Sequence, residues 1–209
     1  MLAGIRVLDM TNVLAGPFCC HQLAHMGAEV IKIEAVGRGD LARQLGSDKD
    51  LSSAKMGISF LAQNSGKKSL SLDLKSEDGK AIFQRLVATA DVLVENFRPG
   101  GLRKYGLDYA SIAAINPGII YCSITGFGQA GPYANRPGYD FLIQGMGGLM
   151  SITGQPDGSP GAGPVKVGVA VCDLFTGLFT ANAALAALAY RNRTGKGQHI
   201  DCALLDSQV

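Results

Sequence analysis

Apolar and polar positions along the first part of the chain switch between the period of a strand and the period of a helix. A short apolar run at Ile5–Met10 has the pattern of a buried strand, and so does Glu29–Glu34. Between them, Phe18–Met26 has the pattern of a helix that starts after Pro17, a residue favoured at the beginning of helices. The sequence therefore predicts a strand–helix–strand unit.

The same alternation is repeated further along the chain. Ser69–Leu74 is predicted as a strand, Ser76–Ala90 as a helix and Asp91–Phe97 as the next strand. A helix over Tyr109–Ile115 and a strand over Ile119–Thr125 follow. Strands that alternate with helices favour an α/β fold, here a Rossmann-like, mainly parallel sheet with helices on both faces.

The last third of the chain contains two loops rich in glycine and proline, Gly126–Gly138 and Gly154–Gly168. A helix is predicted between them, over Tyr139–Met150. Leu174–Tyr190 is apolar around nearly its whole circumference, so we expect a buried helix there. Gln198–Val209 is predicted as a strand turning into a helix, and the sequence stops where that helix begins. We therefore expect residues 1–209 to be the N-terminal large domain of a protein whose second, smaller domain is absent from this sequence.

Composition narrows the classes of function. The chain has 209 residues, 47% hydrophobic, with a formal net charge of only +2 and no tryptophan, which argues against nucleic-acid binding. Five cysteines, an odd number without C-x-x-C spacing, are expected to be reduced and mostly buried, as in a cytoplasmic protein. The apolar stretch Gly177–Tyr190, interrupted by Thr180 and Asn182, is expected to be too short to span a membrane.

Several motifs suggest chemistry that their surroundings do not support. GFGQAG at Gly126–Gly131 matches a dinucleotide fingerprint, but Pro132 and Pro137 hinder the helix which that fingerprint requires. His21 and His25 have a spacing that can chelate zinc, yet no third ligand is evident, so no metal site is predicted. Cys172 lies in an apolar run without a nearby histidine and is interpreted as structural.

Asp173 stands at the junction of a glycine-rich loop and an apolar helix, and its position allows two interpretations. Aspartate is a favoured N-cap, because its carboxylate accepts hydrogen bonds from the free amides of the first turn. A carboxylate held at a helix start can also attack a thioester carbonyl, with nearby amides stabilising the oxyanion. The pattern alone does not choose between them.

An ordered set of blocks over essentially the whole chain resembles the class III coenzyme A transferases, the CaiB/BaiF family. The blocks are VLAGP (Val13–Pro17), GAEVIKIE (Gly27–Glu34), GD-x-x-R (Gly39–Arg43), NSGKKSLSLDLK (Asn64–Lys75), DVLVENFRPG (Asp91–Gly100), RPGYD (Arg136–Asp140), DLFTG (Asp173–Gly177) and TGKGQHIDCALLDSQV (Thr194–Val209).

The resemblance implies that Asp173 is the nucleophile, passing through a mixed anhydride and an aspartyl-CoA thioester. An acyl-CoA thioester and a small free carboxylic or dicarboxylic acid would be the substrates, between which coenzyme A is exchanged, and no tightly bound cofactor is implied. The CoA contacts carried over from the family are Leu14, Ala15, Leu72, Asp73, Leu74, Lys75, Asn96, Phe97, Arg98, Lys104 and Tyr139. Ala35 departs from the family, because some relatives place an arginine there.

Two other functions remain alternatives. The family includes acyl-CoA racemases and epimerases, but their catalytic histidine is replaced here by Tyr139, which disfavours proton abstraction. A non-catalytic CoA-binding subunit is the second alternative. The resemblance also implies that two full-length chains interlock as a homodimer, and that this chain alone lacks activity.

Overall fold

The computed structural model describes residues 1–209 and contains one six-stranded sheet in which all neighbouring strands are parallel. The strand order is β3-β2-β1-β4-β5-β6, the order of Rossmann-type sheets. The predicted α/β fold is therefore confirmed. The strands are β1 (Arg6–Asp9), β2 (Glu29–Glu34), β3 (Lys68–Ser71), β4 (Val92–Glu95), β5 (Ile120–Thr125) and β6 (Gln198–Ala203).

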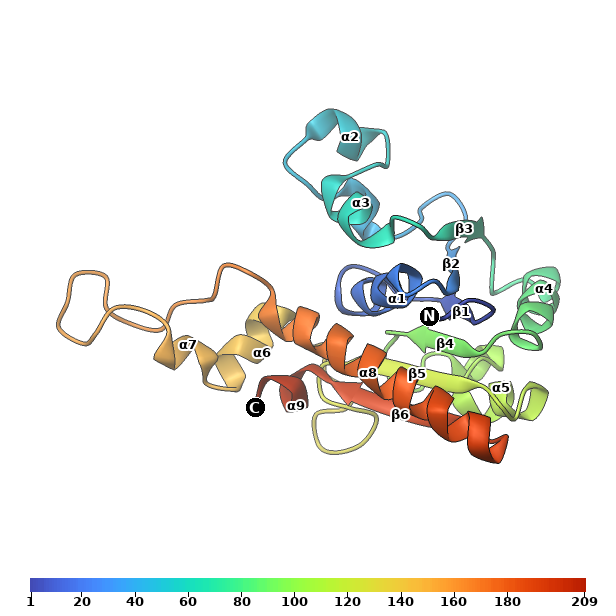
Figure 1. Cartoon of the computed structure of the whole chain (residues 1–209). Coiled ribbons are helices and arrows are strands. Elements are labelled where there is room, and N and C mark those ends of the chain that lie inside the picture. The colour runs from blue at the N-terminus through green and yellow to red at the C-terminus, as the bar shows by residue number, and fades with distance from the viewer.

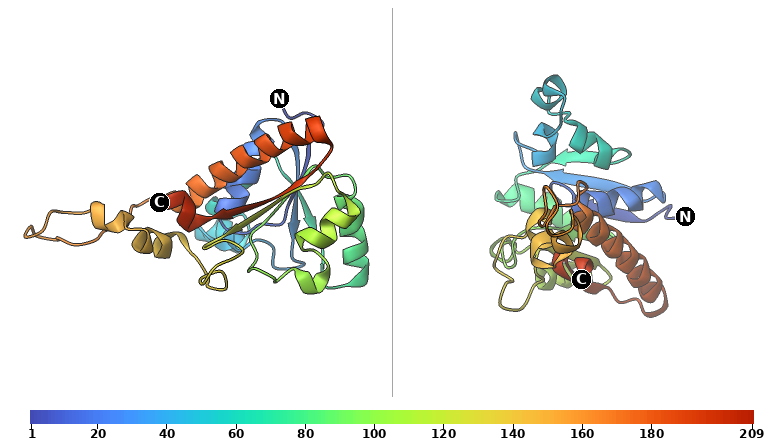
Figure 2. Two further views of the ribbon diagram at one scale, coloured as in Figure 1. Left: turned by 90° about the horizontal axis from the view of Figure 1, so that it is seen from below. Right: turned by 90° about the vertical axis from the view of Figure 1, so that its left-hand side faces the viewer.

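Helices cover both faces of this sheet (Figures 1 and 2). On one face, an apolar cluster joins the strands to α1 (Ala15–His25) and α8 (Val171–Thr194). On the other, a second cluster joins them to α4 (Glu77–Val87) and α5 (Tyr109–Ile115). Because successive strand residues point to opposite faces, Val92 and Val94 belong to the first cluster and Leu93 to the second.

Two helices begin earlier than the sequence predicted. Helix α1 starts at Ala15 rather than after Pro17, so Pro17 lies in its first turn. Proline is tolerated there because amides of the first turn have no intrahelical acceptor, and the amide hydrogen that proline lacks is not needed. Helix α8 starts at Val171 and ends at Thr194, where Gly195 adopts the left-handed conformation (φ 72°) of a helix C-terminus. By length and composition alone, this 24-residue helix could cross a membrane, contrary to the expectation from the shorter apolar stretch.

The surroundings of α8 are those of a core helix on one side only. Its buried residues include Gly177, Ala181 and Ala184, which lie on the side of α8 that packs against the sheet and α1. Phe175 and Phe179 are 52% and 54% exposed, so the prediction of a helix buried all round was wrong for this chain. The apolar face that carries these two phenylalanines lacks a partner within residues 1–209.

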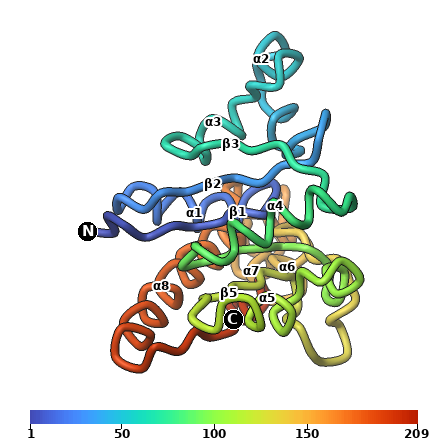
Figure 3. The backbone as a smooth tube through the Cα atoms, turned by 90° about the vertical axis from the view of Figure 1, so that its right-hand side faces the viewer, coloured from blue at the N-terminus to red at the C-terminus, as the bar shows by residue number.

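Two excursions leave the sheet. Between β2 and β3 the chain forms the short helices η1 (Leu41–Gln44), α2 (Lys49–Ser53) and α3 (Ile58–Asn64), which stand beyond the edge strand β3 (Figure 3) and were not predicted. The other excursion carries α6 (Asp140–Met146), α7 (Leu149–Ile152) and the second glycine-rich loop away from the sheet (Figure 2). One helix was predicted over α6 and α7, but Gly148, at φ 86°, separates them.

Of the remaining elements, η2 (Arg103–Tyr105) was not predicted, whereas the last segment follows the prediction. The turn η2 precedes α5, and β6 runs directly into α9 (Leu204–Gln208), as expected for the last segment.

Candidate active site

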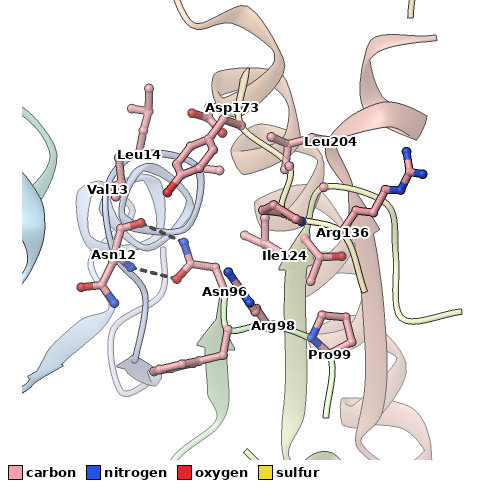
Figure 4. Close-up of a pocket in the computed structure, with 17 residues that line it drawn as sticks. Asn12, Val13, Leu14, Asn96, Arg98, Pro99, Ile124, Arg136, Asp173 and Leu204 are labelled. Carbon is pink, nitrogen blue, oxygen red and sulfur yellow. Dashed lines mark hydrogen bonds between the residues drawn. The ribbon is translucent and has the colours of Figure 1, made fainter. Parts of the chain in front are cut away.

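The parallel sheet has one place where the chain order reverses. Strands β1 and β4 are neighbours, and the chain continues from them toward opposite edges, so a crevice opens beyond their carboxyl ends. The loops that leave these two strands are bonded to each other there. The amide of Asn12 donates to Asn96 Oδ1 at 2.9 Å, and Asn96 Nδ2 donates to the carbonyl of Asn12 at 2.8 Å (Figure 4).

A cavity of about 280 Å³ lies in this crevice. Figure 4 shows Asp173 at one end of it, with Val13 and Leu14 on one side, Leu204 on the other and Arg98 further along. Residues from six segments of the chain therefore meet at the reversal point. The predicted site residues that line the cavity are Leu14, Ala15, Asn96, Phe97, Arg98, Tyr139 and Asp173.

Five predicted CoA contacts lie outside the lining of this cavity: Leu72, Asp73, Leu74, Lys75 and Lys104. The side chain of Leu72 is buried in the second apolar cluster. The amide of Lys75 donates to Asp73 Oδ1 at 2.9 Å in the turn before α4, and the ammonium of Lys104 lies 4.9 Å from the ring centre of Tyr105. Their contact with CoA stays a prediction.

Asp173 is the third residue of α8, so the interpretation of this residue as an N-cap was wrong. The residue before the helix is Ala170, and the capping carboxylate comes from Asp140 on α6. Asp140 Oδ1 accepts the amide of Cys172 at 2.8 Å and that of Asp173 at 3.3 Å, while Gln144 Nε2 donates to Asp140 Oδ2 at 2.6 Å. The carboxylate of Asp173 is thereby left free to face the cavity.

The surroundings of Asp173 favour its neutral form. Burial and the nearby charge of Asp140 raise the pKa of Asp173 from 3.8 to about 7. A carboxylate that is poorly solvated is a better nucleophile than one in water, once it is ionised. Its neighbour Cys172 is fully buried, and burial together with Asp140 raises the pKa of this thiol to about 12, so a thiolate nucleophile is disfavoured.

The first turn of α1 and the second turn of α8 approach each other closely. A side chain at Gly177 would place its Cβ 2.6 Å from the carbonyl oxygen of Ala15, so only glycine permits this contact. The amides of Ala15 and Gly16 are in the first turn of α1, where helix geometry leaves them without intrahelical acceptors. The positive end of the α1 dipole therefore lies beside the cavity that Asp173 also lines, where it can stabilise negative charge that develops on a bound group.

Other motifs from the sequence contribute little chemistry here. No helix begins within Gly126–Gly131. Gly126 instead packs so closely on Gly138 that a Cβ added to Gly126 would lie 2.5 Å from the Cα of Gly138. The ring of His21 lies beside that of His25, and its Nε2 is 2.9 Å from Ser65 Oγ. The five cysteines are unpaired, and all except Cys202 are buried.

Sequence reasoning missed three contributors to the site. Asp140 entered the sequence analysis only as part of the RPGYD block, and no local signal indicates its role, because it is the first residue of α6 but caps α8. Sequence reasoning did not assign Gln144, which follows Asp140 by one helical turn and whose Oε1 accepts the amide of Val167 at 2.9 Å. Val13 has a positive φ of 72°, which nothing in the local sequence indicates.

Fold and site together describe an α/β protein with a carboxylate nucleophile candidate at the reversal point of a Rossmann-type sheet. The chain belongs to CoA-transferase family III, whose family model matches residues 2–209.

Its relatives include named enzymes. It is 53% identical to succinate–glutarate CoA-transferase of Agrobacterium fabrum, 50% to mouse succinyl-CoA:glutarate CoA-transferase and 45% to acetyl-CoA:oxalate CoA-transferase of Acetobacter aceti. These matches cover 99%, 100% and 99% of this chain, and 52%, 46% and 51% of the relatives. The chain thus spans about half the length of the curated relatives it matches.

Solved structures of similar proteins have the same fold as this chain. A CaiB/BaiF family protein from Brucella suis superimposes with a TM-score of 0.90 at 50% identity, covering 99% of this chain and 54% of that one. A hypothetical protein from Mycobacterium tuberculosis gives a TM-score of 0.88 at 38% identity, covering 100% and 55%.

Proposed function

We propose that the protein transfers coenzyme A from an acyl-CoA to a free carboxylic acid, with the side chain of Asp173 as the covalent carrier. The observation that carries this proposal is the placement of Asp173. Its carboxylate lines the cavity at the reversal point of the sheet, while Asp140 takes over the capping role that would otherwise occupy it. The function named for the relatives, CoA transfer between acids, requires a group of this kind.

In the proposed reaction, one carboxylate oxygen of Asp173 attacks the thioester carbonyl and the carbon–sulfur bond breaks, which gives a mixed anhydride and CoA thiolate. The thiolate then attacks Cγ of Asp173, so that the donor acid leaves and an aspartyl-CoA thioester forms. The acceptor acid repeats these steps in reverse. Over one cycle, an oxygen of the acceptor enters Asp173, and an oxygen of Asp173 leaves with the donor.

The chain supplies electrostatic support for these steps. Each step develops negative charge on a carbonyl oxygen or on the CoA sulfur, and the first-turn amides of α1 lie beside the cavity where that charge forms. Arg98, which also lines the cavity and forms no ion pair, is suited to a phosphate of CoA. Lys75 and Lys104 are proposed as further phosphate contacts on the resemblance alone.

A racemase or epimerase is disfavoured by the composition of the cavity wall. Racemisation needs one group to take the α-proton and another to return a proton, and apart from Asp173 neither a histidine nor another carboxylate lines this cavity. Tyr139, which replaces the histidine of the racemases, is 59% exposed and stacks on Phe141. Incorporation of deuterium at the α-carbon of an acyl-CoA, without exchange of CoA between acids, would support the racemase instead.

Trapping with hydroxylamine tests the nucleophile. The protein is incubated with succinyl-CoA and hydroxylamine, and mass spectrometry is expected to find a hydroxamate at Asp173. The Asp173→Asn variant, checked for deamidation, should lose both the adduct and CoA exchange, whereas Asp157→Asn, at an exposed loop aspartate, should retain both. Full exchange activity in Asp173→Asn would refute the mechanism. A wild-type protein that binds CoA but gives neither adduct nor exchange would indicate a non-catalytic CoA-binding subunit.

For the acid substrates we propose small dicarboxylic acids, because several relatives are named for succinate, glutarate or oxalate. Exchange of CoA from succinyl-CoA onto glutarate should exceed exchange onto acetate, and equal rates would remove this preference. We assign the reaction to the cytoplasm, on the basis of the unpaired cysteines.

We also propose that the protein is a homodimer, as the family resemblance implies. Support comes from the apolar face of α8 and the neighbouring α6, where Phe175, Phe179 and Phe141 are more than half exposed, since monomers rarely expose such clusters. Phe179→Asp should convert a dimer to a monomer in sedimentation analysis. Val36→Asp, at an apolar residue that is 63% exposed in a turn, is the matched control.

A further inference from the structure

Four charged side chains are buried together beneath the loop that enters the cavity. Asp9 lies at the end of β1, Lys32 on β2, Asp40 before η1 and Lys67 before β3, and none is more than 2% exposed. Lys32 Nζ lies 2.9 Å from Asp40 Oδ2 and 3.7 Å from Asp9 Oδ2, and Lys67 Nζ lies 2.8 Å from Asp9 Oδ2. Two positive and two negative charges compensate one another, as buried charges require.

The pKa values of Asp9 and Lys32 favour the ionised forms although burial opposes them. Burial alone would raise the pKa of Asp9, but Lys32 and Lys67 outweigh it and hold the pKa below 3.8. Burial would likewise lower the pKa of Lys32, but Asp9 and Asp40 outweigh it and raise the pKa above 10.5. Proposed catalysis by Asp173 uses none of these groups directly.

Side chains of this cluster and Asn96 hold the backbone of residues 11–13. Asp9 Oδ1 accepts a hydrogen bond from the amide of Thr11 at 3.0 Å, and Lys32 Nζ donates one to the carbonyl oxygen of Thr11 at 2.8 Å. Asn96 holds both backbone groups of Asn12. Asp40 Oδ1 accepts the amide of Val13 at 3.0 Å.

The conformation of Val13 needs such support. Its φ of 72° lies in the left-handed region, which residues with branched side chains rarely adopt. Unless contacts with the surrounding structure hold it, we expect this backbone to move to a conformation with negative φ. Val13 is followed directly by Leu14 and the first turn of α1, both on the cavity wall. Asp40 itself is fixed by two contacts, since its amide donates to Glu34 Oε1 at 2.9 Å and its Oδ1 also caps η1 through Ala42.

We propose that Asp40 is a positioning residue for acyl transfer: its carboxylate, neutralised by Lys32, holds Val13 in the left-handed conformation and so fixes the first turn of α1 against Asp173. This inference rests on the proposed function, because it assigns that turn to the stabilisation of charge during transfer. Lys32 compensates the charge of the buried carboxylate, and the carboxylate holds the strained residue in place.

Two charge-balanced double variants separate positioning from general stability. Lys32→Met/Asp40→Asn keeps an oxygen that can accept the amide of Val13, whereas Lys32→Met/Asp40→Ala removes it. Both leave Asp9 paired with Lys67. We expect the alanine variant to have a kcat roughly 100-fold below that of the asparagine variant, with a much smaller change in KM for succinyl-CoA, because displaced amides act mainly on the transition state.

Replacement of Val13 by glycine provides the rescue. Glycine adopts positive φ without strain, so Val13→Gly added to the alanine double variant should recover kcat roughly tenfold. A merely structural role for Asp40 predicts no such recovery. The matched control is Asp48→Ala, which removes a cap of the same kind from α2, where Asp48 Oδ1 accepts the amide of Leu51 at 2.9 Å on the exposed surface. Its kcat should match that of the wild type.

Equal kcat values for the two double variants, or no recovery with Val13→Gly, would overturn the inference. If the alanine double variant does not fold, hydrogen exchange of the wild-type protein decides. The amide of Val13 should be protected by its buried acceptor, and exchange at the rate of a free peptide amide would also overturn it. A wild-type protein without CoA exchange would refute the proposed function, whereas an active wild type with a free Val13 amide refutes only the role of Asp40.

Discussion

Replacing Asp173 by asparagine should make the protein more stable while abolishing transfer, because the raised pKa of this carboxyl means that its ionised form destabilises the fold. The pKa is about 7 in the folded chain against 3.8 for a free aspartate. Between these values, the folded chain keeps a proton that the unfolded chain has lost, so stability falls as pH rises from about 4 to about 7. A difference of about 3 pH units corresponds to about 4 kcal/mol above pH 7.

That figure is an upper bound, because Asp173 is partly exposed and an asparagine side chain also costs energy to bury. We expect a gain in the free energy of unfolding of about 1–3 kcal/mol at pH 8, and less than half of that gain at pH 5.

Urea unfolding of wild type and Asp173→Asn at both pH values measures the effect. Asp157→Asn, at an exposed aspartate, should show little change at either pH. A gain that is equal at pH 5 and pH 8, or a variant that is less stable at pH 8, would refute the reasoning.

Three further predictions concern the neighbours of Asp173. Asp140→Asn removes a charge while keeping an oxygen acceptor for the capped amides, so the pKa of Asp173 should fall toward 3.8. The acid limb of the pH profile of kcat/KM should then move to lower pH, and a limb at an unchanged pH would contradict this. Gly177→Ala places a Cβ 2.6 Å from the carbonyl oxygen of Ala15, so thermal unfolding should show a loss of about 1–3 kcal/mol together with reduced exchange. Arg98→Ala should raise KM for succinyl-CoA roughly tenfold but leave KM for the free acid nearly unchanged, whereas equal changes in both would exclude a contact with the CoA phosphates.

The order of elements could be predicted because it depends on local periodicity. Short apolar runs and helical stretches alternate clearly through the first 125 residues, and β1, β2, β4 and β5 were placed within two residues of their observed limits. The short helices between β2 and β3 were missed, since segments of five to seven residues carry little periodic signal. Helix α8 was predicted too short, because its start depends on a capping carboxylate from Asp140, a residue 31 positions before Val171.

Periodicity and ordered motifs are local properties of the chain, and they were enough to predict the fold class, the family and Asp173 as the candidate nucleophile. The surroundings of Asp173 depend on the tertiary structure. The raised pKa of Asp173, the cap from Asp140 and the left-handed Val13 held by Asp40 arise from contacts between segments far apart in sequence. Such contacts exist only once the sheet has brought the carboxyl ends of β1 and β4 together, and burial changes the energy of a charge by an amount that no local pattern encodes.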